Sequence, residues 1–364
     1  MRIGIFTELY PPHIGGQEVR YAELAACMLR LGHSVDVYCV RHSTDVPERE
    51  IRDGVSIYRH PLATSYKQPI VKALRRKVIA MLRYSLWVRR MARAEQYDLM
   101  LFNQWPLAHV AFAKSVGRPK MVLDWCEVRS GWLYRAFIKW LPLFASKNIA
   151  VSMAVAKSVA AASGCPVNYV PSGVYLSNYH YKRREDRSGL IYLGLVFEHK
   201  NLALLIEAFE LMKRGGYPGD LTIAGGGPEL ETLNRARKIS PFSENIHLLG
   251  YVDEKTKVEL LANSEVLVIP SRREGFPRVV AEGMASGLPT ATVDFPDNGT
   301  KSVVSDYRIG IVAEPNAKAL AAAIGDVMED WDIYSGNCLK YRAELDWDYV
   351  VAKLLACENT AQPA

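Results

Sequence analysis

The sequence lacks several patterns by which common classes of protein are recognised. Its six cysteines show neither C-x-x-C nor His-rich spacing, which argues against a zinc site and against a disulfide framework. No stretch approaches the roughly 18 uninterrupted apolar residues that would span a bilayer. The opening segment MRIGIFTELYPP has no basic region followed by an apolar one, unlike a signal peptide. We therefore expect an intracellular protein that is at most peripheral to a membrane.

Acidic residues are absent from residues 67–93, which carry nine Lys and Arg, although the net charge of the chain is only +6. Apolar residues recur there at near-helical spacing. They are Ile70, Leu74, Val78, Met81 and Leu82, and residues 132–144 add Trp132, Phe137, Trp140 and Phe144. A basic amphipathic helix beside aromatic residues is typical of a membrane-surface element, so we expect contact with an anionic membrane surface. The alternative is an ordinary helix packed on its own domain. Nucleic-acid binding is disfavoured because the basic run is amphipathic and lies inside a folded domain.

The length of 364 residues and the alternation of apolar runs with helical patterns predict two α/β domains. Each would be a doubly wound, Rossmann-like parallel sheet, and ligands would bind in a cleft at the carboxyl ends of both strand sets. We assign residues 1–176 to the first domain, the polar residues 177–189 to a linker, and residues 190–343 to the second domain.

Two glycines, Gly15 and Gly16, follow the first expected strand and precede a helix. Such a loop lets backbone approach a ligand closely, and the helix start offers N–H groups to an anion; a plain tight turn is the alternative. The spacing is not G-x-G-x-x-G, and no acidic residue closes the second strand, which ends on Arg41 and His42. Both absences argue against a dehydrogenase.

Three charged residues in the second half of the chain lie where the expected cleft would place them against a ligand. Lys200 stands just past a strand and before a helix, where its ammonium could neutralise a diphosphate. Glu274 is expected on a loop after a buried strand, and Glu282 in the helix that follows. One carboxylate could then bind sugar hydroxyls and the other a ribose, with N–H groups at the helix start between them for phosphate. The alternative is that these are ordinary surface residues.

Together these features resemble retaining glycosyltransferase family four, also called the group 1 glycosyltransferases, which have the GT-B fold. The resemblance runs nearly end to end. It implies that residues 1–176 bind the acceptor, that residues 190–343 bind the nucleotide-sugar, and that residues 344–364 form a helix that packs back on the first domain. It rests on YPPHIGGQEVRYAELAACMLRLGHSVDVY, VPSGVYLSNY, GLVFEHKNLALLIEAF, AGGGPE, the E-x7-E segment EGFPRVVAEGMASGLPTA, and LDWDYVVAKLL.

The resemblance implies a role for each residue of the donor site. It implies that Glu274 contacts the donor sugar and Glu282 the ribose, while Lys200 and the Gly15–Gly16 loop bind the diphosphate. It places Gly275, Phe276 and the backbone amides of Arg278 and Val279 against the donor. Glu274 and Lys200 would be the catalytic pair. It further implies retention at the anomeric carbon, no cofactor or metal, and a UDP- or GDP-sugar as substrate.

The chain departs from the family at three places. Leu195 stands where an Arg usually follows the glycine, so one diphosphate cation is missing, and Arg272, Arg273 or Arg278 could replace it. Tyr175 stands where an Asp is common. After the strand at 120–124 the usual His is replaced by Trp125 or Cys126. Asp124, Glu127 and Arg129 then become candidates for binding the acceptor.

We expect transfer of a hexose-type sugar to a lipid-linked glycan at the inner face of the cytoplasmic membrane, in cell-surface polysaccharide or glycolipid synthesis. Two alternatives remain: an enzyme with a soluble acceptor, for which the basic segment is incidental, and an inactive partner subunit that binds nucleotide-sugars.

Overall fold

The computed structural model describes residues 1–13, 15–61, 78–114, 120–128 and 132–356. The chain divides into two compact units, residues 1–171 together with the segment from Trp347 onward, and Ser172–Asp346. Among the residues described, no helix combines the length and apolar character needed to cross a membrane. The five described cysteines, Cys27, Cys39, Cys126, Cys165 and Cys338, are free thiols.

In the first unit, the described strands form an eight-stranded sheet in the order β3-β4-β2-β1-β5-β6-β7-β8. All neighbours are parallel except the β3–β4 hairpin. The strands are β1 (Arg2–Phe6), β2 (Ser34–Val40), β3 (Arg49–Arg52), β4 (Val55–His60), β5 (Leu99–Asn103), β6 (Lys120–Trp125), β7 (Lys147–Ala150) and β8 (Val167–Tyr169). The helices are α1 (Gly16–Arg30), α2 (Val78–Ala94), α3 (Ala108–Lys114), α4 (Trp132–Trp140), the 3₁₀ turn η2 (Leu141–Phe144), α5 (Met153–Ser163) and α13 (Trp347–Ala356).

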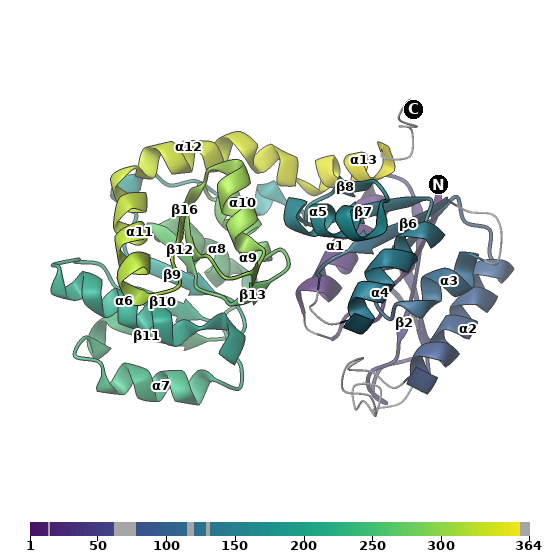
Figure 1. Ribbon diagram of the computed structural model, residues 1–364, viewed down its shortest axis with the longest axis horizontal. Coiled ribbons are helices and arrows are strands. Elements are labelled where there is room, and N and C mark those ends of the chain that lie inside the picture. Colours follow the sequence, from purple (N-terminus) through teal and green to yellow (C-terminus); the bar gives the residue numbers. More distant parts are fainter. Residues whose placement is uncertain (14, 62–77, 115–119, 129–131, 357–364) are drawn as a thin grey trace. The chain divides into compact units, whose positions relative to one another are not determined.

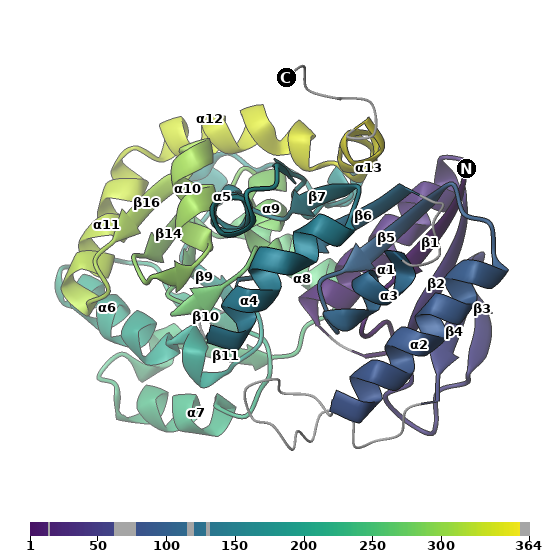
Figure 2. The same cartoon turned by 45° about the vertical axis from the view of Figure 1, so that its right-hand side comes forward.

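A core cluster of this unit is rich in aromatic residues and combines side chains of the sheet with those of α2, α3, α4, η2 and α5. Phe6 stacks on Tyr38 and on Phe102, with ring centroids 4.9 and 4.7 Å apart. Stacking of rings from three neighbouring strands fixes their register, since a one-residue slip would turn each ring to the other face of the sheet. Figures 1 and 2 show α2 and α3 side by side over this core.

The second unit, which is described throughout, contains a six-stranded parallel sheet in the order β11-β10-β9-β12-β14-β16 and a small parallel pair, β13–β15. Its strands are β9 (Leu190–Leu193), β10 (Leu221–Ala224), β11 (Ile246–Gly250), β12 (Val266–Ile269), β13 (Arg273–Glu274), β14 (Thr290–Val293), β15 (Asp297–Asn298) and β16 (Gly310–Ala313). Its helices are α6 (Leu202–Arg214), α7 (Leu230–Ile239), α8 (Glu254–Asn263), α9 (Arg278–Ala285), α10 (Thr300–Tyr307), α11 (Ala317–Glu329) and α12 (Trp331–Tyr341). The short 3₁₀ turns are η3 (Leu176–Asn178), η4 (Arg184–Asp186), η5 (Glu198–Lys200), η6 (Ser243–Asn245) and η7 (Arg342–Leu345).

Residues 177–189 are not a free linker, which corrects the boundary expected from their composition. They belong to the second unit, where the buried guanidinium of Arg187 donates to the carbonyl oxygens of Lys182, Leu261, Ser264 and Ser286. The same guanidinium lies over the Trp331 ring, 5.3 Å from its centroid. A polar segment can therefore be firmly held when one of its charges satisfies buried carbonyls.

The chain returns to the first unit at α13, which packs on α1 (Figure 1). Trp347 is buried there, and its indole N–H donates to Glu23 Oε2 at 2.9 Å. Asp348 pairs with Arg30. The first unit thus extends to Pro171 rather than to residue 176, and the returning helix begins at Trp347 rather than at residue 344.

Candidate functional site

The backbone around Glu274 is fixed by a contact between two loops of the second unit. Glu274 ends β13, which pairs with β15, and Gly299 N–H donates to the Glu274 carbonyl oxygen at 2.8 Å. A Cβ atom on Gly299 would collide with the Gly275 carbonyl, so only glycine allows this close approach. The segment after β14 therefore positions Glu274, although it lies more than twenty residues later in the chain.

The carboxylate of Glu274 is bound on one side by two donors. Its Oε1 pairs with Lys200 Nζ and also accepts a hydrogen bond from Ser271 Oγ at 2.9 Å. Ser271 is buried, while the side chains of Lys200 and Glu274 are 16% and 14% exposed. A salt bridge at this depth is desolvated enough to hold the carboxylate in one orientation. The structure thus brings together two of the predicted donor-site residues.

Lys200 ends the 3₁₀ turn η5. The next residue, Asn201, has the left-handed conformation, with φ 57°, and precedes the first residue of α6. The neighbouring His199 has a lowered pKa because it is partly buried and faces Lys200 and Arg273. Burial, and next the charge of Glu274, raise the pKa of Tyr192, which lies on β9. The charges of this cluster therefore act on one another, as expected of a functional site.

Glu282 lies in α9 and is almost fully buried. Its Oε1 is 2.9 Å from Lys257 Nζ on α8 and 3.4 Å from Arg278 Nη2, one turn earlier in α9. Burial lowers the pKa of Lys257, but the Glu282 and Glu254 carboxylates outweigh it, and the net shift is upward. Glu282, which is predicted to bind the ribose, is thus a buried, ion-paired carboxylate in the middle of α9.

The helix α9 begins at Arg278, after the half-buried Gly275 and Phe276 and the buried Pro277. The N–H groups of the first turn of any helix have no partner within it, so those of Arg278 and Val279 are placed to bind an anion. The N-terminal charge of the helix dipole adds to this effect.

The position of the missing family arginine, Leu195, lies beside a cavity. The cavity has a volume of about 190 Å³ and is lined by Val196, Phe197, Glu198, Glu229 and Arg272, among others. Arg272 is exposed, and its backbone N–H donates to the His199 carbonyl at 2.8 Å. Arg278, by contrast, is engaged with Glu282. Arg272 is therefore better placed than Arg278 to supply the missing cation.

The loops after β9 and β10 approach each other at backbone distance. Val196 N–H donates to the Gly226 carbonyl at 2.9 Å, and a Cβ atom on Gly225 would collide with the Gly194 carbonyl oxygen. Gly225 also has φ 142°, a conformation that other residues rarely adopt. The close packing of these two loops thus explains why glycines are needed in the AGGGPE segment.

In the first unit, Gly15 and Gly16 stand at the start of α1, as the sequence indicates. The Glu18 carboxylate lies against Gly15, and His13 Nδ1 is 2.9 Å from Glu18 Oε1. A carboxylate of the chain itself therefore lies in the first turn of α1, where the helix dipole favours negative charge. The contribution of these glycines to diphosphate binding stays a prediction.

Asp124 does not reach the surface, contrary to what an acceptor-binding residue requires. It is fully buried near the end of β6, and its Oδ2 accepts from Arg20 Nε at 3.1 Å and from the Tyr21 hydroxyl at 3.0 Å. Arg20 in turn donates to the carbonyl oxygens of Pro171 and Val170. The ion pair of Arg20 and Asp124 thus connects α1 and β6 to Val170 and Pro171, which is a structural role.

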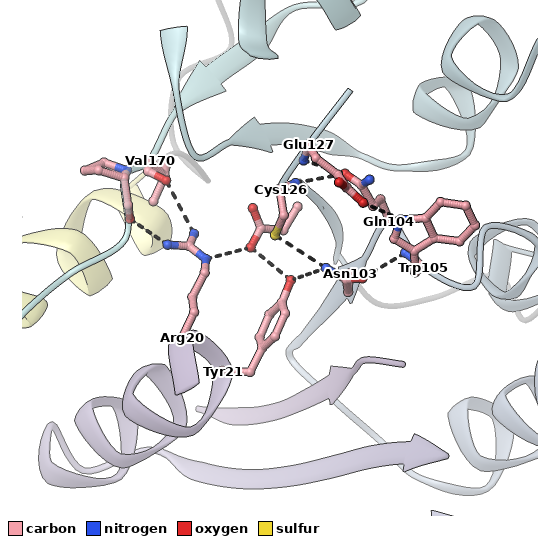
Figure 3. Close-up of polar contacts among 10 residues, drawn as sticks. Arg20, Tyr21, Asn103, Gln104, Trp105, Cys126, Glu127 and Val170 are labelled. Atoms are coloured by element: carbon pink, nitrogen blue, oxygen red, sulfur yellow. Dashed lines mark hydrogen bonds and ion pairs between the residues drawn. The ribbon is translucent and has the colours of Figure 1, made fainter. Parts of the chain in front are cut away.

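Glu127 is only partly buried and is held in place by its neighbours. Trp105 Nε1 donates to Glu127 Oε1 at 3.2 Å, and Gln104 Oε1 accepts from the backbone N–H groups of Cys126 and Glu127 (Figure 3). The Tyr134 hydroxyl donates to the Glu127 carbonyl at 3.0 Å. Glu127 is thus the better of the two acceptor candidates. Arg129 lies outside the described residues.

Two contributors to the site are missing from the expectations of the sequence. Ser271 stands three residues before Glu274, and Lys257 lies on a helix whose polar pattern looks solvent-exposed. The position of Ser271 between a buried strand and Glu274 could have indicated its role. No local signal indicates Lys257. Among the described residues, no group of three or more His, Cys, Asp and Glu is arranged to hold a metal ion.

Comparisons with known proteins agree with the two-unit architecture. The family model described as "Glycosyl transferases group 1" matches residues 180–344, and the one described as "Glycosyl transferase 4-like domain" matches residues 15–173. An uncharacterized glycosyltransferase of Methanocaldococcus jannaschii is 25% identical, over 91% of this chain and 90% of its own. A GDP-mannose-dependent alpha-(1-6)-phosphatidylinositol monomannoside mannosyltransferase of Mycolicibacterium smegmatis is 24% identical, over 90% and 89%.

Solved structures show the same fold. Sucrose-phosphate synthase of Thermosynechococcus elongatus superposes with a TM-score of 0.74 at 16% identity, covering 98% of both chains. Anabaena HepE in complex with UDP and glucose superposes with a TM-score of 0.70 at 16% identity, covering 98% of this chain and 99% of its own. The α/β class and the GT-B fold expected from the sequence are thereby confirmed.

Proposed function

Because the chain belongs to the group 1 glycosyltransferases, we propose that it is a retaining, metal-independent enzyme that moves a hexose-type sugar from UDP- or GDP-sugar to a lipid-linked glycan. The acceptor would lie at the inner face of the cytoplasmic membrane, with the protein peripheral to it. The products would be cell-surface polysaccharides or glycolipids.

The observation that carries this proposal is the joint binding of Glu274 by Lys200 and Ser271. Both donors bind the same oxygen, Oε1, and neither of them occupies Oε2. A carboxylate oriented in this way can accept hydrogen bonds from hydroxyls of the donor sugar. The ammonium of Lys200, which contacts this carboxylate, would then lie beside the diphosphate of the donor. Its positive charge would stabilise the negative charge of the phosphates.

In the proposed step, the acceptor oxygen attacks the anomeric carbon from the face that the diphosphate leaves. The bond between that carbon and the phosphate oxygen breaks, and the acceptor proton passes to the departing phosphate. Lys200, the N–H groups of Arg278 and Val279, and Arg272 in place of the missing arginine would stabilise the negative charge. Such preorganised groups act where charge develops, which is how they speed the reaction.

On the acceptor side we assign Glu127 to an acceptor hydroxyl. Its carboxylate is fixed by Trp105, and its backbone by Gln104 and Tyr134. Asp124 would act on this loop only indirectly, because it is buried and holds Arg20 and Tyr21 in place.

The lipid-linked acceptor is supported by the exposed face of α2, by the last residue of α4 and by η2. Leu82 is exposed, as are Trp140, at 58%, and Leu143, at 53%, while Met81 is part of the core. Residues 67–77 of the basic segment lie outside the described residues. The mycolicibacterial relative is named for a phosphatidylinositol mannoside, which is a lipid-linked glycan.

A panel of nucleotide-sugars tests the proposal. The wild-type protein should hydrolyse one UDP- or GDP-sugar slowly in the absence of acceptor, and addition of a membrane extract should speed its consumption. Glu274→Gln should abolish both reactions while UDP or GDP still binds. Binding of every donor without turnover, even with extract, contradicts the proposed reaction. Turnover with soluble sugars but not with extract contradicts the lipid-linked acceptor.

A further inference from the structure

The exposed face of α2 changes character along its length. In the first half, Ile79, Leu82 and Leu86 are 64%, 43% and 53% exposed. Spacings of three and four residues place them in one stripe. Arg83, four residues after Ile79, is also exposed in this half. In the second half, the exposed residues are Arg89, Arg90, Arg93 and Ala94. The helix thus presents a mostly apolar end, which carries one arginine, and a cationic end to the same side.

A cavity opens beside the cationic end. It has a volume of about 210 Å³ and lies where α2 packs on β4 and its antiparallel partner β3. Tyr58 and Trp87 give it aromatic walls, and Arg49 and Arg90 contribute cations from different elements. A cavity of this size admits a group larger than one water molecule.

The cations of this cavity are available to a ligand to different degrees. Arg49 pairs with Tyr58 across the β3–β4 ladder, so the two side chains share a face, and its guanidinium is 5.8 Å from the Tyr58 ring centroid. Arg59 also lines the cavity, but its guanidinium is engaged, because it pairs with Glu50 and donates to the Pro11 and Pro47 carbonyls.

The acidic residue at the cavity is directed elsewhere. Glu48 is exposed and pairs with Arg41, with Nη1 and Oε1 3.3 Å apart. Two arginines and two aromatic rings in one lining, with the nearby carboxylate already paired, favour an anion. Arginine binds phosphate oxygens in a bidentate manner, and the rings would contact the carbon atoms attached to the phosphate.

We propose that this cavity binds the phosphate headgroup of an anionic membrane lipid. The inference rests on the proposed membrane-face function. The apolar stripe of Ile79, Leu82 and Leu86 enters the acyl region, the arginines of the second half meet the headgroup layer, and one headgroup lies between Arg49 and Arg90. Arg49, which is not on α2, distinguishes such a site from general attraction between a basic helix and a charged surface.

The test uses Arg49→Gln and Arg90→Gln, with Arg93→Gln as the matched control on the same exposed face outside the cavity. The ligand is dihexanoyl phosphatidylglycerol below the concentration at which it forms micelles, measured by calorimetry. The wild type and Arg93→Gln should bind it, and the two cavity variants should bind at least about tenfold more weakly, because each loses a charge-assisted hydrogen bond. Equal thermal melting of all four proteins shows that they are folded.

Vesicles and inorganic phosphate complete the test. Phosphatidylcholine vesicles doped with phosphatidylglycerol should bind Arg93→Gln about fivefold more weakly than the wild type, which is the general effect of one surface arginine. If inorganic phosphate displaces the short-chain lipid at equal concentration, the cavity binds free phosphate and not a headgroup. If all three variants lose vesicle affinity equally and none binds the short-chain lipid differently, the cavity is not a site, but membrane association stands. If the wild type binds no vesicles while it still hydrolyses a donor, both the cavity and the membrane location fail, and the transferase activity does not.

Discussion

Glu282→Ala should have two separable effects, because we assign this residue two tasks. The substitution removes the proposed ribose ligand, and it also removes the buried partner of Lys257. The Lys257 side chain is 10% exposed and would keep only Glu254, which is 86% exposed and 2.6 Å away. Arg278 would lose an acceptor at 3.4 Å.

The cost in stability follows from this environment. Removing one partner of a buried ion pair costs roughly 3–5 kcal/mol, and the remaining Glu254 favours the lower end of that range. For a unit of this size, about 3 kcal/mol corresponds to a fall in melting temperature of roughly 6–12 °C. Loss of a hydrogen bond to a charged group should weaken UDP or GDP binding by roughly 1.5–3 kcal/mol, or about tenfold or more.

The double variant Lys257→Met/Glu282→Ala separates the two effects. Replacing the uncompensated ammonium with an apolar chain of similar length should restore most of the melting temperature, giving a coupling energy of about 1–3 kcal/mol in the double-mutant cycle. Affinity for UDP or GDP, measured by calorimetry, should stay low, because methionine does not replace the carboxylate. If nucleotide affinity returns together with stability, Glu282 acts only by supporting the fold, and its assignment to the ribose is wrong.

Three further predictions concern neighbouring residues. Ser271→Ala should lower kcat by about tenfold and leave UDP or GDP affinity nearly unchanged, because one of the two donors to Glu274 is lost; a changed affinity with normal kcat contradicts this role. The pKa of His199 is lowered in the free protein, so a bound diphosphate should raise it, with uptake of a proton and tighter UDP or GDP binding as the pH falls from 8 toward 6; the heat of binding should depend on the buffer, and His199→Gln should remove both effects. Arg187→Met should destabilise the second unit by roughly 3 kcal/mol or more, measured by urea denaturation, because four buried carbonyl oxygens lose their donor; a change below about 1 kcal/mol contradicts the buried role of the guanidinium.

Local patterns predicted elements that are buried on both faces. The strand expected at 120–124 is β6, which is one residue longer, because a strand buried on both faces appears as a short apolar run. The β3–β4 hairpin was missed, although Asp53 and Gly54 between its strands are a typical turn pair and both have positive φ. The elements β13 and β15 are two residues long, too short for a periodic pattern.

The sequence alone determined the class of the fold, the family and the segments that carry the site, since each depends on periodicity and motif order within short stretches of chain. The partners of each charge were decided only by the tertiary structure. Glu274 binds Lys200, 74 residues away, Glu282 binds Lys257, 25 residues away, and Asp124 binds Arg20, 104 residues away. An ion pair depends on atoms within a few ångströms, and no local spacing encodes which distant segments meet. For that reason the sequence offered Asp124 and Glu127 as equal candidates, and burial separated them.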